Sequence, residues 1–369
     1  MICCIFNIAP SYRKAIFTLL DKELNCHFYI GDKIRQPIKK MDITDLDGFI
    51  VELQNKYIFN DFYWQIGFQK VFKSEYKKYL VTGDLHCISN WIILFYSYIF
   101  NKKVYVWTHG WNGKDGWLKK SIKIFFIKLC TGVFLYGDYA KKIMMKSGIP
   151  ERKLNVIFNS LDYEKQLEVR KKLKRTNVYR NIFRNDYPVI IFIGRIQKNK
   201  KLEEVILAMT EALKENIKLN FILIGGEIDS INLKTVIEEN KMQENVLFYG
   251  SCFDEHKLGE LIYNANVCVS PGHIGLTAIH SLMYGTPIIT HDNVRMQTPE
   301  FEVVNSGFNG DLFEYQNISD LKNKILYWTH DVNFSLQIKE NCYFKIDKYY
   351  NPKFQIRIIK EVLYDNISN

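Results

Sequence analysis

Residues 267–290 read VCVSPGHIGLTAIHSLMYGTPIIT. The first four and the last four of these residues are mostly apolar and rich in β-branched side chains, and glycine lies between each run and the middle segment, which predicts two buried strands. The middle segment carries apolar residues at helical spacing, namely Leu276, Ile279, Leu282 and Met283. Strand, helix and strand in this order form one βαβ unit.

The predicted helix opens at Gly275, Leu276 and Thr277, directly beyond the carboxyl end of the first strand. The N–H groups of a first helical turn lack intrahelical partners and coincide with the positive end of the helix dipole, so such a start attracts phosphate. An ordinary turn without a ligand fits the same residues, because glycine is common at tight turns. Both interpretations stay open at this point.

The chain has 369 residues, and domains usually run ~100 to 200 residues, so we expect two domains. Hydrophobic residues make up 47% and charged residues 24%, a balance typical of a soluble globular protein. The net charge of +10, with a pI near 9.0, favours an anionic partner such as a nucleotide, a phosphorylated lipid or an acidic membrane face. Nucleic acid is not expected, because no basic stripe with interleaved stacking aromatics is present.

The eight cysteines show no CxxC motif and no zinc-ligand spacing, which predicts a reduced, cytosolic protein without a structural metal. The start, MICCIFNIAPSYRK, lacks the basic region of a signal peptide and is expected to be a first strand. The longest apolar run, residues 91–100, is about half the ~20 residues that span a bilayer, so no transmembrane helix is expected.

Strand and helix patterns alternate along both halves of the chain, which predicts two α/β domains, each with a parallel sheet between helices. Residues 59–72 are assigned to one of these helices. The charged segment 163–187 lacks a strand pattern and predicts the linker. We therefore place an N-terminal domain at 1–185 and a C-terminal domain at 186–340, with a helix at about 340–369 crossing back to the first domain.

Residues 114–129 form a basic amphipathic helix in this scheme, with apolar residues on one side and lysines largely on the other. Two interpretations fit. The helix packs its apolar side into the core and leaves a solvated lysine face, or it lies on an anionic membrane surface.

Two groups of polar residues follow predicted strands. Strand 104–107 ends in Thr108-His109-Gly110, and the carboxyl end of a strand is where open α/β sheets bind ligands. Strand 189–194 ends in Gly194-Arg195, with Lys200 five residues further, on the same predicted sheet edge as the helix start at Gly275. Two cations beside a helix start suit a diphosphate, because arginine offers a planar fork and lysine a mobile charge. A solvated basic loop without a ligand is the alternative. A Walker loop and a GxGxxG fingerprint are both absent.

Five segments together resemble a known family: GIPERKLNVIFNSLD, GRIQKNKKLEEVILAM, FILIGG, VLFYG and VSPGHIGLTAIHSLMYGTPIIT. In this order they resemble the retaining glycosyltransferases of family four, which have the GT-B fold. The resemblance implies two doubly wound Rossmann-like domains facing a central cleft. It also implies a nucleoside-diphosphate sugar as donor, UDP- or GDP-linked, with no metal and no other cofactor.

The resemblance assigns roles to individual residues. Arg195 and Lys200 match the cations that hold the donor diphosphate, and His109 resembles a first-domain histidine that reaches the donor sugar. The loop from Asn7 to Arg13 lies on the family's acceptor side. Asp84 is a further candidate for the acceptor side because it follows the strand that reaches Thr82-Gly83, and a turn aspartate that caps the next helix is the alternative. The donor-binding residues implied are Gly194, Gly272, His273, Ile274, Gly275, Leu276, Thr277 and His280.

Two positions depart from the family pattern. Gly272 and His280 stand where the family has two glutamates, the first facing the transferred sugar and the second binding the donor ribose. His273 is a candidate to replace the carboxylate missing at Gly272, and a solvent-facing loop histidine is the alternative.

We expect a cytoplasmic glycosyltransferase at or near the inner membrane face, moving a hexose-type sugar to a glycan or lipid-linked glycan in bacterial surface polysaccharide synthesis, such as lipopolysaccharide or capsule. Two alternatives stay open. One is an inactive GT-B-like protein that binds a nucleotide sugar or a glycan, favoured by Gly272 and His280. The other is a sugar-nucleotide epimerase of the same fold, against which the Arg195–Lys200 loop argues.

Overall fold

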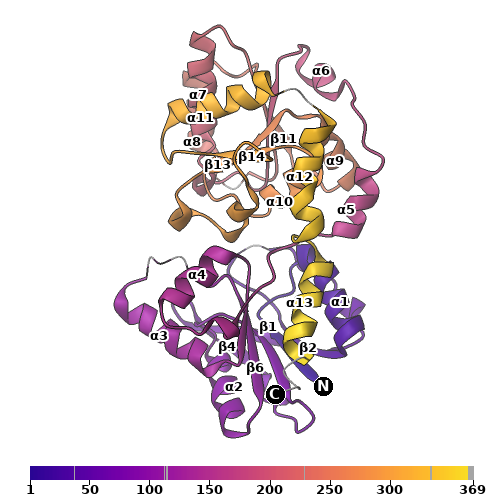
Figure 1. Cartoon of the computed structure of the whole chain (residues 1–369), viewed down its shortest axis with the longest axis vertical. Helices are drawn as coiled ribbons and strands as arrows, with labels where there is room; N and C mark the ends of the chain where they lie inside the picture. The colour runs from indigo at the N-terminus through magenta and orange to yellow at the C-terminus, as the bar shows by residue number, and fades with distance from the viewer. Residues whose placement is uncertain (37, 112, 114, 228, 333–334, 365–369) are drawn as a thin grey trace. The chain divides into compact units, whose positions relative to one another are not determined.

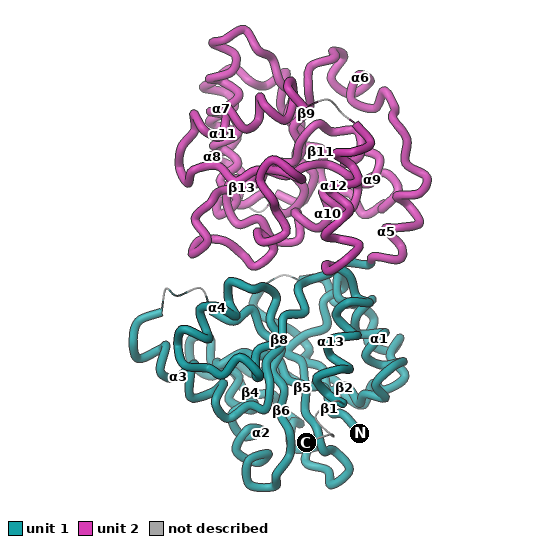
Figure 2. The backbone as a smooth tube through the Cα atoms, in the orientation of Figure 1, with its two compact units in different colours: residues 1–162, 351–369 teal, residues 163–350 magenta. Residues whose placement is uncertain are grey.

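A computed structural model gives the structure of the protein and describes residues 1–36, 38–111, 113, 115–227, 229–332 and 335–364. The chain divides into two compact units (Figure 2). Unit 1 contains Met1–Asp162 together with Asn351–Asn369, and unit 2 contains Tyr163–Tyr350. Each unit has its own sheet and its own hydrophobic core.

Within the described residues, unit 1 has an eight-stranded sheet of order β4-β3-β2-β1-β5-β6-β7-β8. Every neighbouring pair is parallel except β3 with β4, which is antiparallel. The strands are β1 (Ile2–Phe6), β2 (Cys26–Gly31), β3 (Phe49–Phe59), β4 (Phe62–Ile66), β5 (Lys78–Thr82), β6 (Lys103–Thr108), β7 (Gly132–Leu135) and β8 (Leu154–Val156). The order places the carboxyl ends of β1, β5, β6 and β7 side by side.

The prediction of a helix at residues 59–72 is wrong, because this segment completes a β-hairpin and continues into a short 3₁₀ helix. Asn60 has φ 48°, a left-handed conformation that asparagine tolerates and that turns the chain between β3 and β4. Buried Tyr63 and Gln65 alternate with exposed Phe62 and Ile66, so the true period is two residues. The dense aromatic content obscured this period in the sequence.

Helices cover both faces of the sheet of unit 1 (Figure 1). They are α1 (Lys14–Leu24), α2 (Ile88–Ile99), α3 (Trp117–Leu129), α4 (Asp138–Lys146) and α13 (Pro352–Tyr364). One core cluster lies under α1 and α13, and a second lies under α2, α3 and α4. The last helix therefore belongs to the first unit. Ile356, Ile359 and Leu363 of α13 are buried in the cluster that also contains residues of α1.

Within the described residues, unit 2 has a six-stranded parallel sheet of order β11-β10-β9-β12-β13-β14. Its strands are β9 (Val189–Ile193), β10 (Asn220–Ile224), β11 (Val246–Gly250), β12 (Val267–Val269), β13 (Ile288–His291) and β14 (Gly310–Phe313). Its principal helices are α7 (Glu203–Lys214), α8 (Ile231–Glu239), α9 (Glu255–Asn264), α10 (Thr277–Met283), α11 (Ile318–Leu326) and α12 (Leu336–Lys348). The βαβ unit expected at residues 267–290 is present as β12, α10 and β13.

The charged segment after residue 162 is folded onto unit 2. It forms α5 (Tyr163–Arg170) and α6 (Val178–Phe183), and the hydroxyl of buried Tyr179 donates to the carbonyl of Leu261 over 2.6 Å. The units therefore divide at Asp162/Tyr163, whereas the charge pattern placed the boundary after residue 185. Most charged residues of these short helices face solvent, but Arg170 pairs with Asp347 over 2.9 Å. A few anchors such as Tyr179 and Arg170 hold the segment in place, and composition does not reveal such anchors.

Candidate functional site

The loop after β9 carries the two cations singled out in the sequence. Gly194 has φ 139° and donates its N–H to Ile224 at the end of β10. A Cβ at Gly225 would lie 1.9 Å from the Gly194 carbonyl oxygen, so the two strand ends approach too closely for a side chain there. Arg195 follows with an exposed side chain, which makes no hydrogen bond or ion pair with any residue that the structure describes. Its guanidinium is open to a ligand.

Lys200 joins this loop to the loop that precedes α10. Its Nζ donates to the carbonyl of His273 and lies 5.9 Å from the centroid of the Phe192 ring. Two backbone hydrogen bonds close the same contact, from Gly272 N–H to the Lys200 carbonyl (3.0 Å) and from His273 N–H to the Asn199 carbonyl (3.2 Å). The structure thus brings Lys200, Gly272 and His273 together, as the spacing predicts.

The ammonium of Lys200 is largely removed from solvent. Burial lowers the pKa of Lys200 to about 8; the negative charge of Glu300 opposes this shift, and the positive charge of Arg195 adds to it by a smaller amount. A dianionic ligand at this point would favour the charged form of Lys200. The site is therefore complementary to a phosphate group.

Close packing explains why residue 272 is glycine. A Cβ at this position would lie 2.1 Å from the Asn199 carbonyl oxygen and 2.8 Å from the Lys200 carbonyl carbon. No side chain, least of all a glutamate, fits there unless the Lys200 loop moves. The glycine that replaces the family's glutamate at position 272 is thus required by the tight contact between the Lys200 loop and the loop that precedes α10.

At the start of α10, only some of the backbone N–H groups expected to be free for a ligand are free. The N–H of Ile274 donates to Gln297 Oε1 (3.3 Å), and that of Gly275 donates to Thr298 Oγ1 (2.8 Å). The Thr277 hydroxyl donates to the carbonyl of Ile193 over 2.6 Å, which ties the helix to the end of β9. Among the hydrogen bonds of the described residues, none engages the N–H of Leu276 or Thr277, so two amides are left for a ligand.

His280 lies one turn into α10 and contacts a carboxylate that comes from another helix. Its Nε2 is 2.9 Å from Oε1 of Glu255, the first residue of α9. The same oxygen accepts from the Tyr284 hydroxyl (2.7 Å) and from Gln166 Nε2 (3.0 Å). Oε2 makes no hydrogen bond within the described part of the chain, and the Glu255 side chain keeps 19% of its surface exposed. One oxygen is fixed and the other is available.

These contacts keep Glu255 ionised. Burial by itself would raise the pKa of Glu255, but the hydrogen bond and the charge of His280, with the bonds from Tyr284 and Gln166, lower the pKa to about 2. Sequence reasoning missed Glu255. It stands 25 positions before His280, on a different helix, and no spacing rule links the two residues.

In unit 1 the predicted residues gather at the carboxyl edge of the sheet. The His109 ring, exposed beyond β6, lies 4.6 Å from the ring of Tyr136, which follows β7. The Arg13 guanidinium lies over the rings of Trp107 (5.3 Å) and Tyr136 (5.4 Å). Cation–π contact with two rings fixes the arginine near His109.

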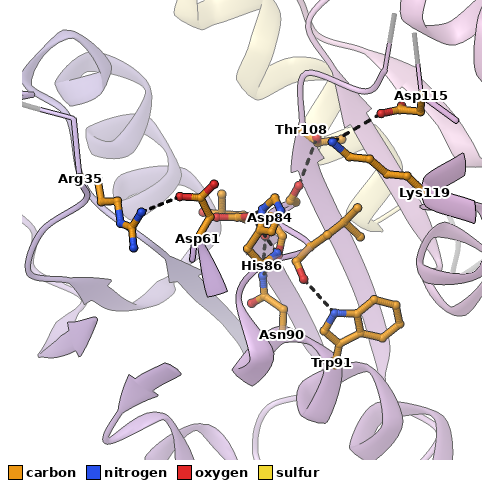
Figure 3. A network of polar contacts seen from close by, with 12 residues as sticks. Arg35, Asp61, Asp84, His86, Asn90, Trp91, Thr108, Asp115 and Lys119 are labelled. Atoms are coloured by element: carbon orange, nitrogen blue, oxygen red, sulfur yellow. Dashed lines mark hydrogen bonds and ion pairs between the residues drawn. The ribbon is translucent and has the colours of Figure 1, made fainter. Parts of the chain in front are cut away.

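Asp84 mainly shapes the turn between β5 and α2 (Figure 3). Its Oδ1 accepts the N–H of His86 (3.0 Å) and lies 3.2 Å from His86 Nδ1. Asn90 Nδ2 donates to the carbonyls of Thr82 and Asp84. The Thr108 hydroxyl, at the end of β6, donates to the carbonyl of Gly83, the residue after β5. The carboxylate is thus held by its own turn, and its acceptor role stays a prediction.

No group of three or more His, Cys, Asp and Glu side chains among the described residues could hold a metal ion. None of the described helices is long and apolar enough to cross a membrane. All eight cysteines are unpaired, and only Cys252 is not buried.

Comparison with known proteins links this site to a family. Residues 174–343, most of unit 2, match the family model described as "Glycosyl transferases group 1". Unit 2 carries a group 1 glycosyltransferase domain. The matched range contains Arg195, Lys200, Glu255 and His280.

Two relatives support the glycosyltransferase domain. The chain is 25% identical over 177 residues to the poly(glycerol-phosphate) alpha-glucosyltransferase of Bacillus subtilis, and 27% identical over 109 residues to the alpha-monoglucosyldiacylglycerol synthase of Streptococcus pneumoniae. These alignments cover 47% and 28% of this chain. They span only 25% and 24% of the two relatives, about a quarter of the length of each.

A structural likeness extends over both units. HepE from Anabaena in complex with UDP superposes with a TM-score of 0.74 at 14% identity, covering 98% of this chain and 100% of that one. Two Rossmann-like units with parallel sheets and such neighbours confirm the GT-B fold class. Membership of the retaining family four stays a prediction.

Proposed function

We propose that the protein transfers a sugar from a nucleoside-diphosphate sugar to a hydroxyl of a glycan or lipid-linked glycan. The observation that carries this proposal is the contact between two loops of unit 2, which presents Arg195 and Lys200 beside the start of α10. The donor is proposed to be a UDP-sugar, since HepE was solved with UDP and with UDP-glucose. One relative is named as an alpha-glucosyltransferase of poly(glycerol-phosphate) and the other as a synthase of alpha-monoglucosyldiacylglycerol, which supports a polymer or a lipid as the acceptor.

The proposed chemistry follows from the charges. Breaking the bond between sugar and phosphate builds negative charge on the leaving diphosphate. Arg195 and Lys200, with the amides of Leu276 and Thr277, stabilise this charge more in the transition state than in the ground state. This stabilisation needs no metal ion, and we propose that transfer proceeds with retention of configuration.

Glu255 and His280 are proposed to hold the donor ribose. The resemblance places His280 at the ribose, and the structure supplies beside it an ionised carboxylate with one free oxygen. Such an oxygen accepts hydrogen bonds from the two neighbouring hydroxyls of a ribose. A carboxylate from α9 would then replace the family's glutamate on α10.

The remaining predicted residues keep the roles that the resemblance implies. His109 is proposed to contact the transferred sugar, and Arg13 and Asp84 to lie on the acceptor side. The stacking of Arg13 and His109 around Tyr136 supports a common site in unit 1. His273 contributes its carbonyl to Lys200, which supports a role in positioning that lysine.

Turnover of variants tests the proposal. Arg195→Ala and Lys200→Ala should each lower the rate of sugar transfer by about one to three orders of magnitude, the effect of one charged stabilising contact. Both variants should unfold at nearly the wild-type temperature, because neither cation supports the core. The assay uses UDP-glucose and a glycerol-phosphate or diacylglycerol acceptor. Lys198→Ala, an exposed lysine in the same loop, is the control. Wild-type transfer by the double variant would refute the mechanism.

One observation favours a protein that binds the donor without turnover. Gly272 provides no carboxylate to the sugar, and the packing around it leaves no room for one. A thermal-shift screen against UDP, GDP, ADP, CMP and dTDP, combined with the transfer assay, distinguishes a transferase from a binding protein. A ligand at about 100 times its dissociation constant stabilises the folded protein by ~2.7 kcal/mol. Stabilisation without transfer to any acceptor would indicate a binding protein, and change of the donor sugar without an acceptor would indicate an epimerase.

A further inference from the structure

Helix α3 exposes its apolar side. Four large side chains are open to solvent over its first nine residues: Trp117 (80% exposed), Leu118 (59%), Ile122 (44%) and Phe125 (50%). Only Phe126 and Ile127 of this helix are buried. The interpretation of a helix that packs its apolar side into the core is therefore wrong for most of its length.

The neighbouring helix α2 extends the same apolar area. Phe95 (45% exposed), Tyr98 (77%), Ile99 (73%) and Phe100 (58%) follow one another along its second half. Helices α2 and α3 lie next to each other (Figure 1). They meet where Trp91 of α2 stacks on Phe125 of α3, with ring centroids 6.2 Å apart. We call these eight exposed residues of α2 and α3 the α2–α3 surface: Phe95, Tyr98, Ile99, Phe100, Trp117, Leu118, Ile122 and Phe125.

The chain around this surface is strongly basic. Residues 90–130 contain seven lysines and a single carboxylate, Asp115. Asp115 forms ion pairs with Lys119 (3.6 Å) and Lys123 (2.5 Å). Lys120 and Lys128 are exposed on α3 itself. Apolar and aromatic side chains are thus bordered by a positive charge that the segment itself does not neutralise.

We propose that the α2–α3 surface docks unit 1 on an anionic lipid bilayer. The aromatic and aliphatic side chains enter the boundary between headgroups and acyl chains, while the lysines contact anionic headgroups. A second copy of the chain fits less well, because a symmetric contact would set the two lysine-rich segments against each other. The attachment that we propose is peripheral, because the side chains enter only the headgroup boundary.

Docking would bring the protein to a lipid-linked acceptor in the same membrane. This benefit of docking rests on the proposed function, because it requires that the protein transfers a sugar to such an acceptor. Docking itself requires no turnover, so vesicle binding and sugar transfer can fail separately. Vesicle binding without any nucleotide-dependent stabilisation would remove the proposed function and keep the docking surface. Transfer to a soluble acceptor without vesicle binding would do the reverse.

Vesicle flotation of the full chain tests the proposal. The wild-type protein should bind vesicles of equimolar phosphatidylcholine and phosphatidylglycerol, and pure phosphatidylcholine vesicles at least about tenfold more weakly. Trp117→Ser with Leu118→Ser should weaken binding to the anionic vesicles by about tenfold or more, because both side chains lie on the inserted face. The control is Ile231→Ser with Phe253→Ser in unit 2, which removes two side chains of 80% and 83% exposure and should leave binding unchanged.

A second pair of variants tests the charge. Lys120→Gln with Lys128→Gln should weaken binding to anionic vesicles about tenfold at low salt and much less at high salt. Lys172→Gln with Lys174→Gln, two exposed lysines of unit 2, removes the same charge and should have little effect. All variants should keep the wild-type melting temperature, since every altered side chain is exposed.

Three results would overturn the proposal. The first is that the wild-type protein does not bind anionic vesicles, and the second is that it binds anionic and neutral vesicles equally well. The third is that the surface variants and the control variants lose the same amount of vesicle binding. A dimer in gel filtration that Trp117→Ser with Leu118→Ser dissociates would assign the surface to self-association instead.

Discussion

At the residue scale, Lys200 links burial to ligand charge. Only the protonated ammonium attracts a diphosphate, and the pKa of Lys200 is lowered to about 8 in the free protein. The affinity for UDP should therefore be nearly constant below pH 8 and fall as the pH rises above it. A tenfold increase of Kd from pH 7 to pH 9 is expected, about the loss of the protonated fraction.

Calorimetric titration with UDP at the two pH values measures this change. Lys200→Arg is the control, since a guanidinium stays charged over this range and should flatten the pH dependence. An equal fall of affinity in Lys200→Arg would assign the titration to another group.

Glu255 gives a second prediction at the same scale. Glu255→Gln removes the negative charge and keeps the side-chain size, so the affinity for UDP should fall about tenfold, the effect of one charge-assisted hydrogen bond. Glu260→Gln is the matched control, because Glu260 lies on the same helix and pairs with Lys257 over 2.8 Å, away from His280.

A comparison of ligands identifies the group that Glu255 contacts. With 2′,3′-dideoxy-UDP, the wild-type protein and Glu255→Gln should bind with the same affinity, because the hydroxyls that donate to the carboxylate are missing. A tenfold difference that persists with the dideoxy ligand would show that Glu255 acts on the fold of the site and not on ribose.

At the element scale, helix α12 carries a buried cation into unit 2. Lys339 is 4% exposed and donates to the carbonyls of Tyr263 (3.1 Å) and Gly285 (3.5 Å). Burial lowers the pKa of Lys339 to about 7 from an ordinary value of 10.5. Between these values the unfolded chain binds more protons than the folded one, so stability rises with pH from about 7 to 10.5.

Replacing this lysine isolates its contribution. The wild-type free energy of unfolding should rise between pH 7 and pH 9 by about 2 kcal/mol more than that of Lys339→Met. Urea denaturation at both pH values measures the difference. Lys200 titrates in the same window and is present in both proteins, so it does not affect the comparison. A parallel change in the two proteins would contradict the assignment.

At the scale of the whole molecule, unit 1 is built from two distant parts of the chain. Helix α13 (Figure 1, yellow) packs on α1, where Lys360 pairs with Glu23 over 2.9 Å, and Gln355 donates to the carbonyl of Phe158 over 2.8 Å. Ending the chain after Tyr350 removes three core side chains of unit 1: Ile356, Ile359 and Leu363.

This truncation should unfold unit 1 and spare unit 2. Each lost side chain contributes about 1.5–3 kcal/mol, and a domain has only about 5–15 kcal/mol of stability in total. Limited proteolysis should then digest residues 1–162 and leave residues 163–350 protected. Ile359→Ala is the milder variant and should destabilise unit 1 by about 2–5 kcal/mol. Equal protection of both units in the truncated chain would refute this dependence.

The sequence by itself determined the α/β class, most strands and helices, and the pair of cations. These follow from local periodicity and from the rule that parallel strands end at one edge, so Arg195, Lys200 and the residues before α10 could be placed together without coordinates. The resemblance of five short segments then indicated a glycosyltransferase, and the comparisons support a group 1 glycosyltransferase domain at residues 174–343. The assignment to the retaining family four stays a prediction.

Only the tertiary structure decided how these residues are used. The lack of space around Gly272, the carboxylate of Glu255 beside His280 and the exposed apolar side of α3 all depend on contacts between segments distant in the chain. The hairpin β3–β4 was also outside the reach of local patterns. Periodicity gives the direction of a side chain relative to its own helix or strand, whereas packing against other elements decides whether that side chain is buried, paired or free.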